Sequence, residues 1–391
     1  MVLCLGYRSA CSSIPSMVIE FTAWVGVATT EDFFVISVYS STLTPTPVPV
    51  QKKGTPMRTA IIGCSGSGKS DLYAALAGPN KAAVSPRVTV KVLEPRLMPL
   101  IVLYHPKKVT YSEIEYLDVF GGINVSSLGE RMLNEARPAD CLLAVLDNFS
   151  GLVDPNAQKV AIDVDTIVSD LAVVEKRLER ISLDRRKSRN VLDLQEKMLQ
   201  QAQILLESER PLRSEQALAD NLLLRGFSFL SAKPILYAWN CKESSLADFI
   251  LPQDDPNIGN IKISARLERE LSEFSDPIER KIFLADLGLT VSVLDLVVAK
   301  TYELLGLIAF FTAGHKEVRA WAVRRGVTAP EAAGIIHSDI QKGFIRAEVL
   351  GWNDFLNAGD HKKAKALGLA RLEGKDYIVA DGDIIEFRFN V

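Results

Sequence analysis

Residues 63–70 read Gly63-Cys64-Ser65-Gly66-Ser67-Gly68-Lys69-Ser70 and directly follow the apolar run at 60–62. This is the complete G-x-x-x-x-G-K-[ST] pattern of a phosphate-binding loop. Its glycines let successive backbone N–H groups converge on one anion, Lys69 would reach the β- and γ-phosphates, and the Ser70 hydroxyl would ligate Mg²⁺. A helix is expected from Asp71 onward, with its N-terminus facing the same anion. The chain is therefore predicted to bind a nucleoside phosphate through residues 63–71.

The plain alternative is a Gly/Ser-rich turn before a helix. The apolar run before the loop and the helix-forming stretch after it are the context that a phosphate cradle requires. We therefore favour the phosphate-loop interpretation.

The length and the net charge of the chain limit the classes of protein to which it can belong. The chain has 391 residues with 45 Lys+Arg and 48 Asp+Glu, which gives a formal net charge of −3. Its length predicts two to four domains, and the charge gives no global attraction to nucleic acid, so no DNA specificity is expected and any RNA contact must be local. The pattern favours no particular oligomeric state. Five cysteines without a CxxC pair indicate reduced, cytoplasmic usage: Cys4, Cys11, Cys64, Cys141 and Cys241.

The first 56 residues differ from the remainder of the chain. No run of 18 apolar residues occurs, so no membrane span is predicted. Residues 44–56 (TPTPVPVQKKGTP) have the Pro- and Thr-rich composition of an extended linker. We expect residues 1–56 to be a disordered or misannotated extension and Met57 to be the functional start.

Short apolar runs recur after the loop, separated by helical stretches. Such runs are typical of a parallel sheet covered on both faces, so the predicted fold is a doubly wound α/β sheet of the P-loop NTPase type. The expected strands are 88–93, 114–119, 141–146, 234–239 and 260–263.

The ends of these strands carry candidate nucleotide contacts. Asp118-Val119-Phe120-Gly121 has D-x-x-G spacing, in which Asp118 would hold Mg²⁺ and the Gly121 amide would sense the γ-phosphate. Asn240-Cys241-Lys242-Glu243 stands in the place of the base-reading N-K-x-D motif of GTPases. Ser264-Ala265-Arg266 would form the loop beneath the base.

Together these motifs resemble the YchF-type Obg-like ATPases, with N-x-x-E in place of N-K-x-D. The resemblance covers residues 57–391 and is strongest over the last 80 or so. There it rests on stretches such as Phe311-Thr312-Ala313-Gly314, Gly343-Phe344-Ile345-Arg346-Ala347-Glu348-Val349 and Arg371-Leu372-Glu373-Gly374-Lys375-Asp376-Tyr377. It implies a C-terminal α+β, β-grasp-like TGS domain, ATP as the nucleotide with Mg²⁺, and a ribosome or ribosomal RNA as partner.

Residues 152–229 contain almost no glycine and repeat aliphatic residues at coiled-coil spacing. The resemblance implies that they form a coiled-coil arm inserted in the nucleotide-binding domain (57–151 and 230–305), followed by the TGS domain at 306–391. The expected seam is Ile167, Leu171, Val174, Leu178, Ile181, Val191, Leu194, Met198 and Leu205.

Two basic clusters stand out on this slightly acidic chain. Each alone is most simply a solvated face. Two clusters beside one nucleotide site favour a large polyanionic partner such as ribosomal RNA. They are Arg185, Arg186, Lys187 and Arg189 at the arm tip, and Arg319, Arg324, Arg325, Lys342 and Arg346 in the C-terminal part.

Departures from the family pattern bear on catalysis. By resemblance, Gly66 replaces an asparagine linked to potassium, and Ala144 replaces the proposed catalytic histidine. The stretch in which the family carries its switch-I threonine is missing from this chain. Thr89 is the nearest residue with a hydroxyl group, and it falls inside an expected strand. Phosphoryl transfer depends on such positioning and charge-stabilising groups. We therefore expect tight nucleotide binding and slow, potassium-insensitive hydrolysis.

Three functional hypotheses remain at this stage. The first is a weak ATPase that uses Lys69, Ser70 and Asp118 at the phosphates and Asn240, Lys242 and Glu243 at the base. The second is a nucleotide-gated ribosome- or RNA-binding module with vestigial hydrolysis, and the third is a GTPase. Turnover with and without ribosomes separates the first two.

Cys64 admits two interpretations. At a helix N-terminus beside Lys69 its thiol pKa would fall, which would make it an oxidation-sensitive gate on the pocket. A small residue filling a loop position is the simpler interpretation and the one we favour.

Overall fold

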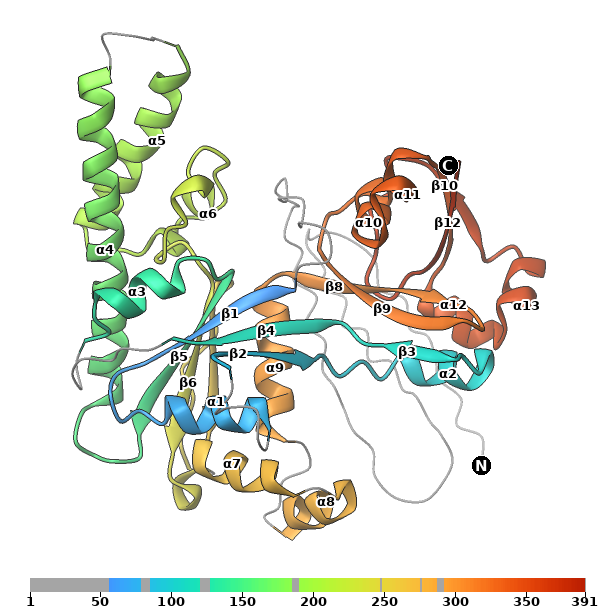
Figure 1. Ribbon diagram of the computed structural model, residues 1–391, viewed down its shortest axis with the longest axis horizontal. Helices are drawn as coiled ribbons and strands as arrows, with labels where there is room; N and C mark the ends of the chain where they lie inside the picture. Colours follow the sequence, from blue (N-terminus) through green and yellow to red (C-terminus); the bar gives the residue numbers. More distant parts are fainter. Residues whose placement is uncertain are drawn as a thin grey trace, which may run out of the picture. The chain divides into compact units, whose positions relative to one another are not determined.

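Two six-stranded sheets, each with its own core, make up the computed structural model (Figure 1). The structure describes residues 56–78, 85–119, 127–184, 190–246, 248–274, 276–286 and 292–390. Residues 1–55 of the expected extension 1–56, Gly121 and the basic arm tip at 185–189 lie outside these ranges.

The first sheet is the predicted nucleotide-binding sheet, with strand order β2-β4-β1-β5-β6-β7. All five expected strands are present, and the phosphate loop follows the central strand β1. The sheet departs from expectation at one edge, where β2 runs antiparallel to β4. Mixed sheets often carry such an edge strand. The strands are β1 (Met57–Ile62), β2 (Arg87–Lys91), β4 (Glu113–Asp118), β5 (Cys141–Asn148), β6 (Ile235–Cys241) and β7 (Ile258–Ile263).

Helices cover both faces of this sheet, as the doubly wound prediction requires. Along β1, Ile61 packs with α1 (Lys69–Ala77), α7 (Ala265–Glu273) and α9 (Val293–Leu304). The alternate residues of β1 face the other core, which includes α3 (Glu130–Ala136) and the start of the arm. A further helix, α8 (Pro277–Asp286), follows α7.

The inserted arm is a helical hairpin of α4 (Pro155–Asp184) and α5 (Asn190–Glu207), drawn in green in Figure 1. On α4 the predicted seam is correct, since Ile167, Val174 and Ile181 are buried. On α5 it is partly wrong, because Leu194 is 60% exposed. The predicted Leu205 is buried and the predicted Met198 packs partly against the same core, which also contains Leu199, Ala202 and Leu206. The chain returns to the sheet through η1 (Leu212–Ser214), α6 (Gln216–Ala219) and η2 (Arg225–Phe227).

Buried polar contacts fix the root of the arm to the nucleotide-binding sheet. Asp170 of α4 is fully buried, pairs with Arg137 at 2.9 Å and accepts the Leu230 and Ser231 N–H groups. Two turns earlier on α4, Asp163 pairs with the buried Arg213 at 2.6 Å. Buried charges are tolerated only when they are paired and hydrogen-bonded. These two pairs therefore fix how the root of the arm packs against the sheet.

The second sheet forms the C-terminal α+β unit, with strand order β11-β10-β12-β8-β9-β3. One face packs against α10 (Ala329–Ile336), which begins with a capping box between Thr328 and Glu331, and α11 (Ser338–Lys342). The other face packs partly against α12 (Trp352–Ala358) and α13 (His361–Ala366). The strands are β3 (Lys108–Thr110), β8 (Leu307–Ala313), β9 (Glu317–Arg324), β10 (Phe344–Leu350), β11 (Arg371–Glu373) and β12 (Ile384–Phe389).

A segment between β2 and β4 crosses into this C-terminal unit. Strand β3 pairs in parallel with β9, and α2 (Leu97–Tyr104) places the buried Leu97 and Leu100 in the same core as Phe311. Arg96 holds this segment to the C-terminal unit, because its guanidinium pairs with Glu94 in the segment and, at 2.9 Å, with Asp381. The two sheets are therefore connected through residues 94–110 as well as through the chain after α9.

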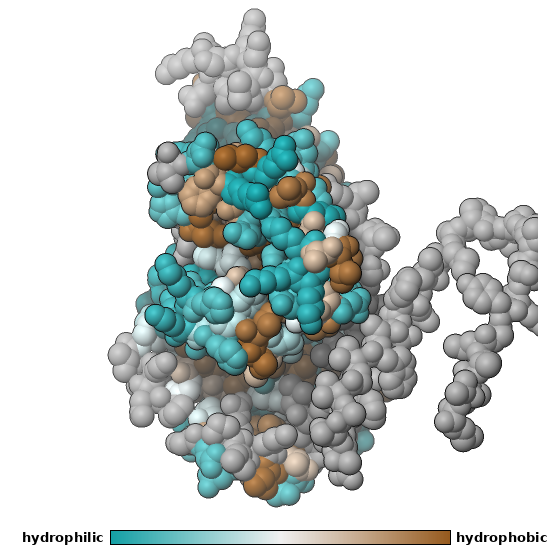
Figure 2. All heavy atoms as spheres, turned by 90° about the vertical axis from the view of Figure 1, so that its right-hand side faces the viewer, coloured by the Kyte–Doolittle hydropathy of each residue, from teal (hydrophilic) through white to brown (hydrophobic). Residues whose placement is uncertain are grey.

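The predicted C-terminal basic cluster is not a single exposed patch. The Arg319 guanidinium lies 3.7 Å from the ring centroid of Trp321. Burial lowers the pKa of Arg324, which lies 3.9 Å from Asp140. The exposed members are Arg325, Lys342 and Arg346. Figure 2 looks onto the right-hand side of Figure 1 and shows hydrophilic side chains interspersed with small apolar groups.

Among the described ranges, no helix combines the length and the apolar character that crossing a bilayer requires.

Helix α2 offers a test of the crossing segment. Leu100→Ala removes a fully buried side chain and should lower the free energy of unfolding of the C-terminal sheet by ~2–5 kcal/mol, because it leaves a cavity. Met98→Ala on the same helix, where the side chain is 56% exposed, should change it by less than about 0.5 kcal/mol. Hydrogen exchange of β8 and β9 amides measures both. Equal exchange in the two variants would show that α2 does not stabilise that sheet.

Candidate functional site

The phosphate loop connects β1 to α1 at the carboxyl edge of the first sheet. Gly66 and Gly68 have φ angles of 82° and 89°, which favour glycine. A Cβ on Gly66 would meet open space, whereas a Cβ on Gly68 would lie 2.2 Å from Asn240 Nδ2. Gly68 is therefore required by the close approach of Asn240 as well as by the backbone.

Asn240 joins the two loops that the sequence singled out. Its side chain is 5% exposed; Nδ2 donates to Ser67 O at 2.9 Å and Oδ1 accepts from Ala265 N at 2.9 Å. One amide thus holds the loop after β1 and the loop after β7 together, from the end of β6. The structure brings together motifs that are more than 170 residues apart in sequence.

Lys69 and Asp118 lie beside each other next to the loop. Lys69 Nζ donates to Val119 O and lies 3.6 Å from Asp118 Oδ1. That carboxylate oxygen is buried without a hydrogen-bond partner among the described residues. Ser70 is exposed in the first turn of α1. A hydroxyl and an unsatisfied carboxylate oxygen are the hard oxygen ligands that Mg²⁺ prefers, so these residues fit the predicted ion.

Two adjoining cavities lie along this edge. The smaller, of about 350 Å³, is lined by residues 63–71 and Phe149. The larger, of about 850 Å³, is lined by Asn240, Cys241, Lys242, Glu243, Ser244, Ser264, Arg266, Arg269, Glu270 and Glu273, and shares Gly68, Asp71 and Phe149 with the first.

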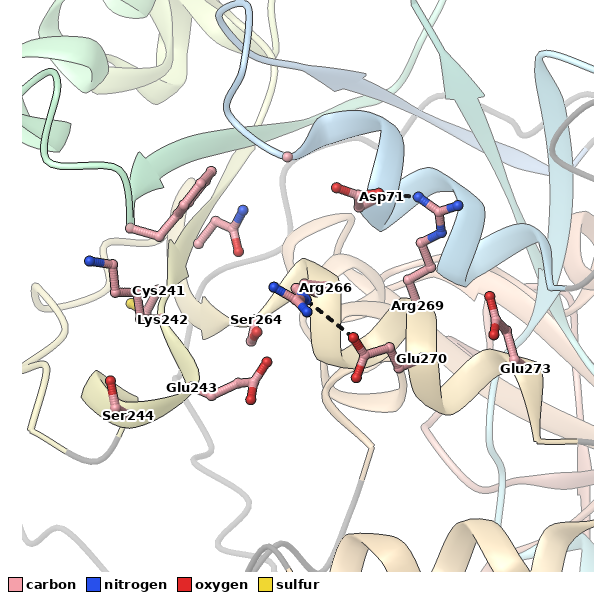
Figure 3. Close-up of a pocket in the computed structure, with 13 residues that line it drawn as sticks. Asp71, Cys241, Lys242, Glu243, Ser244, Ser264, Arg266, Arg269, Glu270 and Glu273 are labelled. Carbon is pink, nitrogen blue, oxygen red and sulfur yellow. Dashed lines mark hydrogen bonds and ion pairs between the residues drawn. The ribbon is translucent and has the colours of Figure 1, made fainter.

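Most of the predicted base-side residues lie around the larger cavity (Figure 3). Glu243 begins η3 (Glu243–Ser245), and its carboxylate points toward Ser264 and Glu270 in this view. Ser264 caps α7 by accepting from Leu267 N. Arg266 pairs with Glu270 at 3.1 Å along α7.

Sequence reasoning missed part of the lining, namely Phe149, Arg269, Glu270 and Glu273. Phe149 directly follows β5, and the carboxyl ends of neighbouring parallel strands meet at one edge, so its position gave a usable signal. Arg269 pairs with Asp71 at 2.7 Å and connects α7 to α1. That contact depends on how two helices pack, which no local pattern specifies.

Cys64 does not have the properties of an oxidation-sensitive gate. Its side chain is buried, and burial, with a smaller effect of the Asp165 charge, raises the pKa of the thiol. A raised pKa disfavours the reactive thiolate. The structure therefore supports the simpler interpretation, a small residue that fills the loop. Cys241 is also buried, and its sulfur accepts from Asn148 Nδ2 at 3.2 Å.

Two residues named in the sequence analysis as departures from the family's catalytic pattern, Ala144 and Thr89, lie inside strands of the first sheet. Ala144 is fully buried in β5 between Ile62 and Tyr237 of the neighbouring strands. Thr89 lies inside β2 opposite Glu115. The side chain at Ala144 offers no polar group for chemistry.

Comparison with known proteins gives consistent similarities. Residues 307–390 match the family model YchF-GTPase_C, described as a protein of unknown function (DUF933). The chain is 36% identical to "Ribosome-binding ATPase YchF" of Bacillus subtilis, over 86% of this chain and 100% of that protein. It is 31% identical to the protein of the same name from Escherichia coli O157:H7, over 85% and 99%.

Solved structures agree with this fold. The Schizosaccharomyces pombe YchF GTPase matches with a TM-score of 0.75 and 25% identity, over 88% of this chain and 100% of that chain. A GTP binding protein from Pyrococcus horikoshii matches with a TM-score of 0.56 and 15% identity, which bears on the fold alone.

The Asn240 bridge can be tested with two glycine variants. Gly66→Ala should lower the free energy of unfolding by ~1–2 kcal/mol, the cost of a left-handed residue with a side chain. Gly68→Ala should cost at least ~1–3 kcal/mol more, because its Cβ displaces the buried Asn240 amide from its partners. Thermal unfolding of both variants measures the difference. Equal melting temperatures would contradict the bridge.

Proposed function

Because this chain belongs to the YchF family, we propose that it binds ATP with Mg²⁺ at the phosphate loop, hydrolyses it slowly and associates with ribosomes. The observation that supports the proposal is the Asn240 bridge, which joins the phosphate loop, lining one cavity, to the loop after β7, lining the adjoining one. The curated relatives are named ribosome-binding ATPases, which supports the proposed use of ATP and the proposed association with ribosomes.

The phosphates are assigned to the smaller cavity. Backbone N–H groups of the loop and the N-terminus of α1 provide donors, and Lys69 provides a positive charge beside Asp118. Ser70 and Asp118 are the proposed Mg²⁺ ligands, Asp118 through water. The ion, when bound, neutralises charge between the β- and γ-phosphates. Gly121, whose amide is expected to sense the γ-phosphate, lies outside the described ranges, so that role stays a prediction.

The base is assigned to the larger cavity, with Phe149 as an aromatic wall. Aromatic contact with a base is favourable and tolerates any base, so selectivity must come from polar groups. Guanine would need a carboxylate that accepts from N1–H and the 2-amino group in register, and Glu243 is one methylene longer than the aspartate of GTPases. Glu243 can instead accept from the 6-amino group of adenine. This favours ATP, while GTP remains the alternative outcome of the binding test.

Slow hydrolysis follows from the groups that this chain lacks. Ala144 is apolar, and Gly66 has no side chain to hold a potassium ion. We also propose the predicted domain boundaries, with residues 94–110 contributing to the C-terminal unit as well. Ribosome association would place the protein in the cytoplasm, and the exposed Arg325, Lys342 and Arg346 are candidate contacts to RNA phosphates.

A calorimetric panel tests the base assignment. The parent should bind Mg·ATP at least about tenfold more tightly than Mg·GTP, a difference of about 1.4 kcal/mol. Glu243→Asp should shift the preference toward GTP by restoring the geometry of a bidentate carboxylate–guanine contact. Lys69→Ala should abolish binding of both. Tighter binding of GTP than of ATP by the parent would overturn the ATP assignment.

Turnover tests the hydrolysis proposal. Single-turnover rates should be slow and unchanged, within about twofold, when potassium replaces sodium. Restoring one group, as in Ala144→His, should change little because catalytic groups act as a unit. ATP turnover and co-sedimentation measured with ribosomes separate the remaining hypotheses. Faster turnover in the presence of ribosomes supports an ATPase, and ribosome binding without turnover supports the nucleotide-gated module. A clear potassium stimulation would contradict the proposal.

A further inference from the structure

Asp147, at the carboxyl end of β5, has no assignment in the nucleotide site described above. We propose that it is a positioning residue, which fixes Phe149 as the wall shared by the phosphate and base cavities and thereby raises affinity for the nucleoside part of the ligand. The inference rests on the proposed nucleotide-binding function.

The contacts of the Asp147 carboxylate are confined to the loop that carries Phe149. Oδ1 accepts the Phe149 N–H at 3.1 Å and the Ser150 N–H at 2.9 Å, and Oδ2 accepts the Ser150 hydroxyl. Ser150 Oγ in turn accepts from Leu152 N at 3.1 Å. Asp147 itself is 5% exposed, and its three bonds to residues 149 and 150 are partly buried, whereas the bond from Leu152 N is exposed. The carboxylate therefore sets the conformation of residues 149–152.

Two further contacts anchor the start of this turn. The Asp147 N–H donates to Gln158 Oε1 of the arm helix α4 at 2.8 Å, and Gln158 is 1% exposed. The neighbouring Asn148 donates to Sγ of Cys241, the last residue of β6. The turn is thus fixed between the arm root and the base side of the pocket.

The position of Phe149 gives this arrangement a ligand-related consequence. Phe149 lines both cavities, together with Gly68 and Asp71, so it lies where the phosphate-side and base-side cavities meet. A free loop would have to order when the ligand binds, and ordering costs affinity. A turn already fixed by Asp147 removes that cost.

The test compares ATP with inorganic tripolyphosphate, both with Mg²⁺, on the full chain by calorimetry. Asp147→Ala should weaken ATP binding by about tenfold, in the range for the loss of one base–aromatic contact. Tripolyphosphate affinity should change by less than about twofold, because the phosphate cavity keeps Lys69 and the loop. Asp147→Asn keeps an Oδ1 acceptor for both N–H groups and should retain ATP affinity within about threefold.

Controls separate positioning from general damage. Phe149→Ala should weaken ATP about as much as Asp147→Ala, and the double variant should be no weaker than either, since both remove one contact. Asp154→Ala also removes a carboxylate contact to a backbone N–H two residues on, that of Asn156, but an exposed one at a residue that lines neither cavity, and should leave ATP binding unchanged. Should Asp147→Ala fail to fold, the Asn and Phe149 variants still carry the comparison.

The outcomes are distinct. Unchanged ATP affinity in Asp147→Ala, additive losses in the double variant, or equal losses for ATP and tripolyphosphate would each overturn the positioning proposal. A parent protein that binds neither ligand would overturn the proposed function instead.

Discussion

The Asn240 amide donates to Ser67 O and accepts from Ala265 N, and the candidate site depends on this pair of bonds. It fixes the phosphate loop against the loop after β7, and it requires glycine at position 68, where any Cβ would collide with it. Because Asn240 is almost fully buried, losing either partner would leave an unsatisfied amide at a cost of about 1–3 kcal/mol. Asn240 lines the larger cavity, which shares Gly68, Asp71 and Phe149 with the smaller one.

The parts of the fold that local sequence determines were predictable. The phosphate loop, the strands that end at Asp118 and Asn240, and the α4 seam are each encoded by a short pattern. What failed depends on long-range packing: the antiparallel β2, the exposed Leu194, and the partly buried Arg319 and Arg324. At Cys64 the interpretation favoured from the sequence, a small residue that fills the loop, agrees with the burial that raises the pKa of its thiol.

The crossing segment 94–110 and the root of the arm each connect another part of the chain to the first sheet. Strands β2 and β4 lead from the edge of the first sheet beside Asp118 to α2 and β3 in the second sheet, where Arg96 bonds Asp381. On the other side of the nucleotide site, α4 bonds the turn after β5 through Gln158 and the chain at Leu128 through Asp165. The arm is thus bonded directly to the strand β5 that ends beside the pocket, and the C-terminal unit to the segment that joins β2 to β4 of the same sheet, which sequence spacing alone does not reveal.

The central claim is that residues 63–71, 240–243 and 264–266 form one ATP-binding site around Asn240. Hydrogen–deuterium exchange of the full chain, with and without Mg·ATP, tests it most directly. The account predicts slower exchange in all three segments together on adding ATP, and no such change in Lys69→Ala. Protection of the phosphate loop alone, with 240–243 and 264–266 unaffected, would contradict it.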